Sequence, residues 1–592
     1  MSNHDCEPNR DVNETDHAML VVWGQYAHCL GIPQGFTNVP SSQKTVEYSP
    51  QSKVLEFLVA QLGGLEYLKD ISLSATPLDQ DRAVAQAWGQ SGWADHSGVS
   101  RTLSALTEDE AAQYIANLEH ATQALIDGGV QQALSVGAVV LDGDLSPRPV
   151  SNSSCTYPEA TYGHMNDRLQ LGYQAAVISM RSPTYGRLGL SACRHSGKTV
   201  SMTQAEALAL EAERRLGRRP LRRTDLLAQR LEQRQAEWHK RQMKVTEAEQ
   251  GLVEAKGERE KVIQALEQAR VHLAELEGDY QERQCPERPN SHLAKARRKA
   301  GVYQKRLERR QRSVLKAQDW LKQQQVRLAE WEAETADLER RLERFQAENA
   351  ANPNPIQAVL RLDAGFGTVS NVALLIEMGY EVYTKPYGTW LSGMLAKMSA
   401  EKAQDWRQVG KNAEMLAWKA VQVVDFPYPL DLGYERFWQG QADGQSKLAF
   451  SGLLHFGPQH VTEDLPTWFH HYNARQSIEA GKKEAHQVFE VHHIKVRSLP
   501  AMCLQEYFAL FAANFVRFAA HWLAEQCPQV PTGWQASQSP KVKEQVKVGA
   551  HSPACVEWYG TDCLVRFNER SVYVGRSLLV RRQVAIQLTL RI

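Results

Sequence analysis

The feature of this sequence that most constrains its fold is a pair of heptad repeats, separated by a short segment with two prolines. The first repeat steps by four and three residues from Val262 to Tyr280, and the second from Tyr303 to Phe345. Such spacing is typical of helices that pack along one another. The prolines of CPERPNS (285–291) are incompatible with one continuous helix. The sequence therefore predicts an antiparallel helical coiled-coil hairpin, with arms of about 60 residues that would extend roughly 90 Å.

The hairpin region is the basic part of a chain whose total formal charge is zero. The sequence has 68 Lys and Arg and 68 Asp and Glu residues, so bulk charge gives no argument for a nucleic-acid or membrane partner. Residues 211–350 hold 32 basic and 25 acidic residues, a net charge of +7. Basic residues gather in RRLGRRPLRR (214–223) and KARRKAGVYQKRLERRQR (295–312). This pattern fits either a solvated coiled-coil face or a surface that binds phosphates.

The composition is that of a folded, soluble protein. Hydrophobic residues make up 43% and charged residues 23% of the chain, which excludes a wholly disordered or collagen-like class. Nine cysteines without a C-x-x-C pair indicate neither a zinc ribbon nor a disulfide scaffold. The N-terminus lacks the basic and apolar regions of a secretory signal. The most apolar window, 501–523, contains Glu506 and Arg517, and it therefore predicts a buried soluble helix rather than a membrane span.

Changes in pattern divide the chain into segments and predict a mixed α/β fold class. Within a helical N-terminal region, residues 83–105 suggest either a DNA-reading helix-turn-helix or a plain packing unit. Three strand-like runs follow, and a strand, helix, strand pattern begins after Pro355. The expected segments are a helical, DNA-binding N-terminal domain (1–130), a first core part (131–204), the hairpin (205–352), a second core part (353–386), a β-rich insertion (387–467), a helical end of the core (468–525) and a small β-type C-terminal segment (526–592).

Carboxylates stand where the predicted elements would let them converge. Asp142 and Asp144 are two apart on a predicted strand, so both point to the same face of a sheet. Asp363 ends a hydrophobic strand, and the glycines after it favour an open end of the sheet. Phosphodiester cleavage builds charge on the attacking and leaving oxygens, which two divalent cations about 4 Å apart stabilise. Mg²⁺ prefers oxygen ligands, so three such acids would suffice to hold it.

A third acid lies in HYNARQSIEA, where Tyr472, Arg475 and Glu479 are spaced Y-x2-R-x3-E. On one helix these positions share a face, so the three side chains would face the same space. The triple alone is weak evidence, and its place after two acid-bearing strand regions gives it weight.

These motifs together resemble the DDE insertion-sequence transposases, in the subgroup with a Y-R-E signature. The matching segments are LDGDLS, RLDAGFG, YNARQSIE and QEYFALFAANFVRFAAHWL, within residues 130–200 and 355–523. The resemblance implies an RNase H-like core with a mixed sheet, interrupted by the hairpin and the β-rich insertion. It also implies Mg²⁺-dependent chemistry, with two ions and Mn²⁺ as a substitute, that cuts DNA at terminal inverted repeats and joins the 3′-hydroxyl ends to target DNA.

The resemblance assigns roles residue by residue. The implied catalytic, metal-binding acids are Asp144, Asp363 and Glu479, with Asp142 as the alternative first acid. Asp144-Leu145-Ser146 fits the family's Asp-x-Ser pattern, whereas Asp142 does not. The expected DNA contacts are Tyr472, Arg475, Lys482, Lys483, Arg361 and Lys385.

One position departs from the family. A lysine is common seven residues after the glutamate, but His486 stands there, with Lys482 and Lys483 nearby. His492 and His493 are interpreted as surface or packing histidines.

The implied partners are DNA, as transposon ends and target, and a second copy of the chain in a homodimeric synaptic complex. The expected location is the bacterial cytoplasm, at the nucleoid and without a membrane. Two other functions are compatible with the sequence: an RNase H-like nuclease that never joins strands, and a non-catalytic coiled-coil protein that scaffolds DNA.

Overall fold

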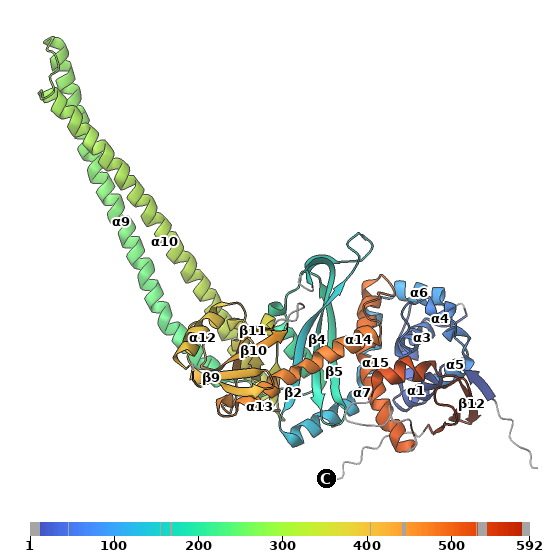
Figure 1. The fold of residues 1–592 in the computed structure, drawn as a ribbon. Helices are drawn as coiled ribbons and strands as arrows, with labels where there is room; N and C mark the ends of the chain where they lie inside the picture. The colour runs from blue at the N-terminus through green and yellow to red at the C-terminus, as the bar shows by residue number, and fades with distance from the viewer. Residues whose placement is uncertain are drawn as a thin grey trace, which may run out of the picture. The chain divides into compact units, whose positions relative to one another are not determined.

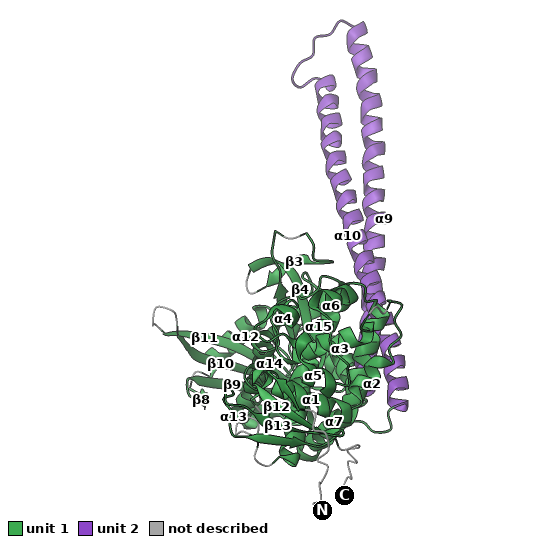
Figure 2. Cartoon of the chain, turned by 90° about the vertical axis from the view of Figure 1, so that its right-hand side faces the viewer, with its two compact units in different colours: residues 1–221, 352–592 green, residues 222–351 purple. Residues whose placement is uncertain are grey.

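The computed structural model describes residues 12–582, except for 45–46, 154, 166–167, 403, 441–445, 528–529 and 531–540. The chain forms two compact units (Figure 2). The hairpin unit comprises Arg222–Ala351, and the main unit comprises Met1–Leu221 with Asn352–Ile592. Helices and a mixed sheet confirm the mixed α/β class.

The hairpin unit consists of two long helices, α9 (Thr224–Glu282) and α10 (His292–Ala350), which run side by side in opposite directions (Figure 1). Residues 283–291, with both prolines, are not helical, as predicted. Several heptad positions are buried, including Leu266 on α9 and Val314 and Leu338 on α10. Apolar residues at this spacing are therefore what holds the two helices together.

The main unit is built around a ten-stranded mixed sheet. Its central strand β2 (Val139–Pro149) pairs antiparallel with β4 (Arg168–Ser182) and parallel with β6 (Ala358–Arg361). β6 pairs parallel with β7 (Glu381–Thr384), and β5 (Gly186–Ser196) pairs antiparallel with β4. The remaining strands are β3 (Thr161–Met165), β8 (Arg407–Gly410), β9 (Ala413–Val421), β10 (Leu430–Gly440) and β11 (Ser446–Phe456).

Alternation along β2 separates its side chains onto two helix-covered faces. Gly143 lies against Leu362 and Leu208 of α8 (Ala205–Leu216). The even-numbered positions 142–148 face the other way, toward α14 (Ser477–Gln487) and α15 (Leu499–Gln526). Figure 1 shows α14 crossing beside this part of the sheet. All polar side chains of β2 therefore gather under α14 and α15.

The apolar helix α15 belongs to the core. It is the one helix of the described residues that is long and apolar enough to cross a membrane, and 72% of its most apolar window is buried inside the fold. The prediction of a buried helix is therefore confirmed. The helices not yet given are α1 (Ala18–Cys29), α2 (Ile32–Thr37), α3 (Pro50–Leu62), α4 (Asp70–Leu73), α5 (Arg82–Ala87), α6 (His96–Ser104), α7 (Glu108–Val136), α11 (Val369–Glu377), α12 (Trp390–Glu401), α13 (Leu465–Asn473) and α16 (Val542–Lys547).

The N-terminal and C-terminal regions share one small sheet. β1 (Val12–Thr15) pairs antiparallel with β12 (Ala554–Tyr559), and β13 (Asp562–Phe567) and β14 (Ser577–Val580) complete it. The segment 526–592, expected to be β-type, also contains the helix α16 before these strands and a turn at residues 572–575. Residues 583–592, the end of this expected β-type segment, lie outside the described residues.

The helix-turn-helix expected within residues 83–105 is not supported. Helices α5 and α6 are separated by residues 88–95. That connection is longer than the turn of about three or four residues in the DNA-binding motif. The buried side chains of both helices instead favour the alternative of a plain packing unit.

A buried charge cluster joins α15 to the sheet. Glu506 of α15, only 3% exposed, accepts hydrogen bonds from Arg148 at 3.1 and 2.6 Å and from Arg194 of β5 at 2.9 Å. Burial by itself raises the pKa of Glu506, but the two guanidinium groups outweigh it and lower the pKa to about 2. The cluster therefore depends on an ionised Glu506.

We expect Glu506→Gln to lower the free energy of unfolding by ~3–5 kcal/mol at neutral pH, because two buried guanidinium groups lose their counter-charge. Glu525→Gln, at an exposed position of the same helix, is the control. Because the folded-state pKa is depressed, the stabilisation is complete above about pH 4.3 and is lost as pH falls toward 2. Urea denaturation across this range should show the difference between wild type and variant shrinking as the pH is lowered. A difference independent of pH would contradict the ion-pair explanation.

Candidate active site

Three carboxylates from distant parts of the chain gather at one edge of the main sheet; we call Asp144, Asp363 and Glu479 the carboxylate cluster. Asp144 lies on β2, and Asp363 caps the short helical turn Ala364–Phe366 that follows β6. The parallel register pairs Asp142 with Arg361, so two further residues along each strand bring Asp144 beside Asp363. Glu479 lies in the first turn of α14. Adjacent parallel strands and one helix therefore supply the cluster.

Lys482 links two members of the cluster. Its ammonium contacts Asp144 Oδ2 and lies 3.1 Å from Glu479 Oε1, one turn earlier on α14. The carboxylates of Asp144 and Glu479 therefore approach the same ammonium group. Arg475 Nη1 lies 3.8 Å from Asp144 Oδ2. Two cationic side chains therefore hold carboxylates that would otherwise repel one another.

The pKa shifts in the cluster follow from these neighbours. Burial raises the pKa of Asp144, the Asp363 charge raises it further, and Lys482 and Arg475 offset only part of this effect. Burial also favours a higher pKa for Glu479, but Lys482 outweighs it and the pKa is lowered. Two acids that share the Lys482 ammonium thus have pKa values shifted in opposite directions, a pattern that is concentrated at functional sites.

Asp142, the alternative first acid, has a different role. Both of its carboxylate oxygens accept hydrogen bonds from Arg361, at 2.7 and 2.8 Å, and Ser477 Oγ donates to Oδ2 at 3.2 Å. Asp142 is 1% exposed and Arg361 is 0% exposed. The prediction that Arg361 contacts DNA is therefore wrong, because its guanidinium is enclosed by protein. The structure favours Asp144 as the first acid of the cluster.

The sequence predicted that the Y-R-E residues lie on one helix. The structure places them on three separate elements. Tyr472 belongs to α13, Arg475 to the short 3-10 helix Ala474–Gln476, and Glu479 to α14. Tyr472 is 4% exposed and its hydroxyl donates to the backbone oxygen of Leu362 at 3.2 Å. The expected phosphate contact of Tyr472 is therefore wrong for this arrangement. Its hydroxyl instead anchors α13 to the strand end that carries Asp363.

The other predicted DNA contacts differ in how accessible they are. Lys385 Nζ lies 2.9 Å from Glu435 Oε1 and above the ring of Tyr472. Lys483 is exposed on α14. Lys482 is engaged by the carboxylates, and only 19% of its side chain is exposed.

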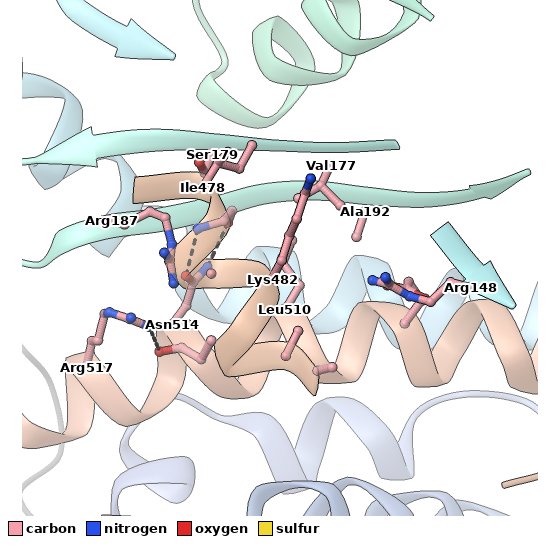
Figure 3. A pocket seen from close by; sticks show the side chains of 16 residues that line it. Arg148, Val177, Ser179, Arg187, Ala192, Ile478, Lys482, Leu510, Asn514 and Arg517 are labelled. Atoms are coloured by element: carbon pink, nitrogen blue, oxygen red, sulfur yellow. Dashed lines mark hydrogen bonds and ion pairs between the residues drawn. The ribbon is translucent and has the colours of Figure 1, made fainter. Parts of the chain in front are cut away.

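A pocket beside Lys482 is lined by Arg148, Arg187 and Arg517 together with apolar side chains (Figure 3). It lies between α14, α15 and strands β4 and β5, and Figure 3 shows the Lys482 side chain extending along it toward Val177. Arg187 and Arg517 line it and both pair with Glu484 of α14, at 3.6 and 2.8 Å. These arginines are distant from Glu484 in sequence, so their ion pairs could not be predicted from the sequence. The contact between Lys482 and Glu479 could have been predicted, because the two residues have i, i+3 spacing on a helix.

His486 stands where the family has lysine, and the structure turns it away from the cluster. Its Nε2 lies 3.1 Å from Arg148 Nη1, beside the buried Glu506. Burial, followed by the charge of Arg148, lowers the pKa of His486 to about 4, so it is neutral at pH 7. His486 therefore provides no positive charge to the cluster.

No model of a known protein family matches the sequence, and a search of curated proteins finds no match either.

We expect Asp142→Asn and Asp144→Asn to change stability in opposite directions at neutral pH. Asp142→Asn leaves the buried Arg361 without its counter-charge and should lower the free energy of unfolding by ~3–5 kcal/mol. Asp144→Asn should raise it, because a carboxylate whose pKa is raised by folding is less favourable as an ion in the folded state. Chemical denaturation of the two isosteric variants checks this, and equal losses would contradict the assignment of roles.

Proposed function

We propose that this protein is a DDE transposase, which cleaves DNA at the ends of an insertion sequence and joins the freed 3′-hydroxyl ends to target DNA. The observation that carries the proposal is the convergence of Asp144, Asp363 and Glu479, which are up to 335 positions apart in the sequence. Asp144 is only 3% exposed, and burying an ionised carboxylate is costly unless the charge is paired or coordinates a metal. Two of these acids also have shifted pKa values.

The order of strands supports an RNase H-like core. Along the sheet, the strands run β5, β4, β2, β6, β7, with the first three antiparallel and the last three parallel. In chain order this is 3-2-1-4-5, with α8 before the fourth strand and α11 between the fourth and fifth. The first strand carries Asp144, and the fourth strand leads into Asp363, as the resemblance to the transposases implies. Both insertions leave the register of these five strands intact.

The donor set suits a hard divalent cation. Its members offer only carboxylate oxygens, the ligands that Mg²⁺ prefers, and the Lys482 ammonium already lies against two of them as a cation. Asp144, Asp363 and Glu479 would hold the metal, and Mg²⁺ or Mn²⁺ bound there would stabilise negative charge on the reacting phosphate. The positive charge of Arg475 also offsets the repulsion between these acids.

The chain's own cations then have defined tasks. Lys482, once released from Asp144 and Glu479, would contact a DNA phosphate beside the cluster, and the exposed Lys483 would contact the backbone farther out. Arg475 would orient the acids and the nearest phosphate. The partners in this proposal are transposon-end and target DNA and a second copy of the chain, in the cytoplasm at the nucleoid.

We expect purified full-length protein to cut and join DNA that carries the terminal repeats of its own element, in the presence of Mg²⁺. Asp144→Asn, Asp363→Asn and Glu479→Gln should each reduce cleavage by more than the ~100-fold typical of losing an outer-shell partner of a metal site. Glu463→Gln, whose side chain is 81% exposed near α13, should behave as wild type. Gel assays of end cleavage and of strand joining measure the two steps separately.

The outcomes separate the alternatives. Cleavage without joining would favour an RNase H-like nuclease. If wild type and the three acid variants all bind DNA but none of them cleaves it, the result would favour a non-catalytic scaffold and would end the transposase proposal.

A further inference from the structure

A cluster of two histidines and two glutamates lies in the connection between α14 and α15, outside the carboxylate cluster. Glu490, His492 and His493 each direct a ligand atom into one space, and these atoms lie within 4.8 Å of one another. Glu66, which follows α3, approaches from the N-terminal region, with Oε1 3.3 Å from His493 Nδ1. Two segments more than 400 residues apart therefore meet at imidazole and carboxylate groups.

The backbone is shaped to bring these groups together. Glu490 adopts a left-handed conformation with φ of 50°, which residues with a Cβ rarely take and which is most often retained at functional sites. The turn is closed by a hydrogen bond from the His493 amide to the Glu490 carbonyl, at 3.1 Å. It places both imidazoles beside the Glu490 carboxylate, with His492 Nδ1 3.8 Å from Oε2.

The orientation of Glu490 and the exposure of the other ligands also suit a cation. Of the two carboxylate oxygens of Glu490, Oε1 accepts a hydrogen bond from Lys547 Nζ at 2.8 Å, and Oε2 is directed toward His492. The carboxylates of Glu66, Asp70 and Glu490 and the ammonium groups of Lys495 and Lys547 surround this place, so it carries charges of both signs. The side chains of His492, His493 and Glu66 are 38%, 28% and 48% exposed, so they can close by the roughly 1 Å that tetrahedral coordination requires.

We propose that Glu66, Glu490, His492 and His493 form a binding site for a transition-metal ion of the Zn²⁺ class. Two imidazoles and two carboxylates are a ligand set that Zn²⁺ accepts and that Mg²⁺ does not favour. The site is therefore chemically distinct from the carboxylate cluster. A metal there would fasten the segment after the Glu479 helix to the end of α3.

The test uses untagged full-length protein, freed of metal with a chelator, and Co²⁺ as a spectroscopic probe that Zn²⁺ displaces. Wild type should bind one Co²⁺ with visible absorption bands and release it to one Zn²⁺. His492→Ala/His493→Ala and Glu490→Gln should lose these bands, whereas His272→Ala/His292→Ala, exposed histidines of the hairpin unit, should keep them. Circular dichroism checks that the variants are folded.

Asp144→Asn/Asp363→Asn should also keep the bands. The test of this metal site is therefore independent of the test of the proposed function. The proposal is overturned if wild type gives no bands, or if the folded His492 and His493 double variant binds Co²⁺ as wild type does.

A second surface, on the hairpin unit, is carried by a separate observation. Between residues 293 and 318, α10 has ten Lys or Arg residues and one acid, Glu308. Arg297 and Arg310 pair with glutamates of the same hairpin, and no ion pair among the described residues involves the other eight. These eight, the α10 stripe, are all exposed: Lys295, Arg298, Lys299, Lys305, Arg306, Arg309, Arg312 and Lys316.

The stripe has the spacing of one helix face. Lys295, Arg298, Lys305, Arg309, Arg312 and Lys316 follow steps of three, seven, four, three and four residues, so they lie along one side of α10. The stretch is about 32 Å long at 1.5 Å per residue. The facing half of α9, residues 258–282, has seven acids and three bases, so the positive charge is confined to one edge of the hairpin.

We infer that the α10 stripe binds the phosphate backbone of DNA without reading sequence. A linear array of unpaired cations matches a backbone with one charge per ~1.7 Å of duplex, whereas specific recognition would need side chains suited to base edges. This inference deepens the proposed function, and it is tested by binding alone so that it can fail while cleavage stands.

The test measures DNA affinity of full-length Asp363→Asn protein across a range of salt concentrations. Lys305→Gln, Arg309→Gln, Arg312→Gln and Lys316→Gln together should weaken binding at least ~10-fold and reduce the salt slope by about three to four. The control changes Lys240, Lys244, Lys256 and Lys261 of α9 to Gln, and should leave the slope near that of the parent. An unchanged slope overturns the inference, and an altered oligomeric state with unchanged DNA affinity would assign the stripe to a second copy of the chain.

Discussion

The candidate site depends on one buried ion pair between neighbouring parallel strands. Arg361 on β6 and Asp142 on β2 meet with both carboxylate oxygens engaged, and both residues are almost fully buried. Breaking such a pair is expensive because it leaves an uncompensated buried charge, so the pair is suited to holding the register of two short strands. That register brings Asp144 beside Asp363. The buried Asp142 thus positions Asp144, the proposed first acid of the cluster, two residues later.

Positive charges surround the even-numbered face of β2. Arg361 balances Asp142, Lys482 and Arg475 balance Asp144, and Arg148 pairs with Glu506. The balance is incomplete only at the carboxylate cluster, where the pKa of Asp144 is raised in spite of two cationic neighbours. Charge compensation elsewhere fixes the helices, and the residual imbalance lies at the carboxylate cluster, where we propose that a divalent cation binds.

The two large insertions enter where the chain leaves the sheet. The hairpin unit comes between α8 and β6, and strands β8 to β11 extend the sheet beyond β7. Neither interrupts the pairing of β2 with β4 and β6. The long helices are held together by their own heptad contacts, so a large addition is compatible with the core because its stability is local.

Local pattern determined much of this protein: the paired long helices from heptads and prolines, the strands β2, β4, β5, β6, β7 and the buried helix α15 all follow from periodicity and apolar content. The sequence also indicated the acids of the cluster, because acids at strand ends and in the Y-R-E spacing are visible locally. Sequence-based prediction failed where contacts between distant residues determine the environment of a side chain. Arg361 is buried against Asp142, and Tyr472 is buried against the end of β6. The single helical face expected for Tyr472, Arg475 and Glu479 is interrupted by a short 3-10 helix. Only the tertiary structure could bring Lys482 to Asp144 and Glu66 to His493, since in both pairs the partners are hundreds of residues apart and neither one's neighbours in the chain carry information about the other.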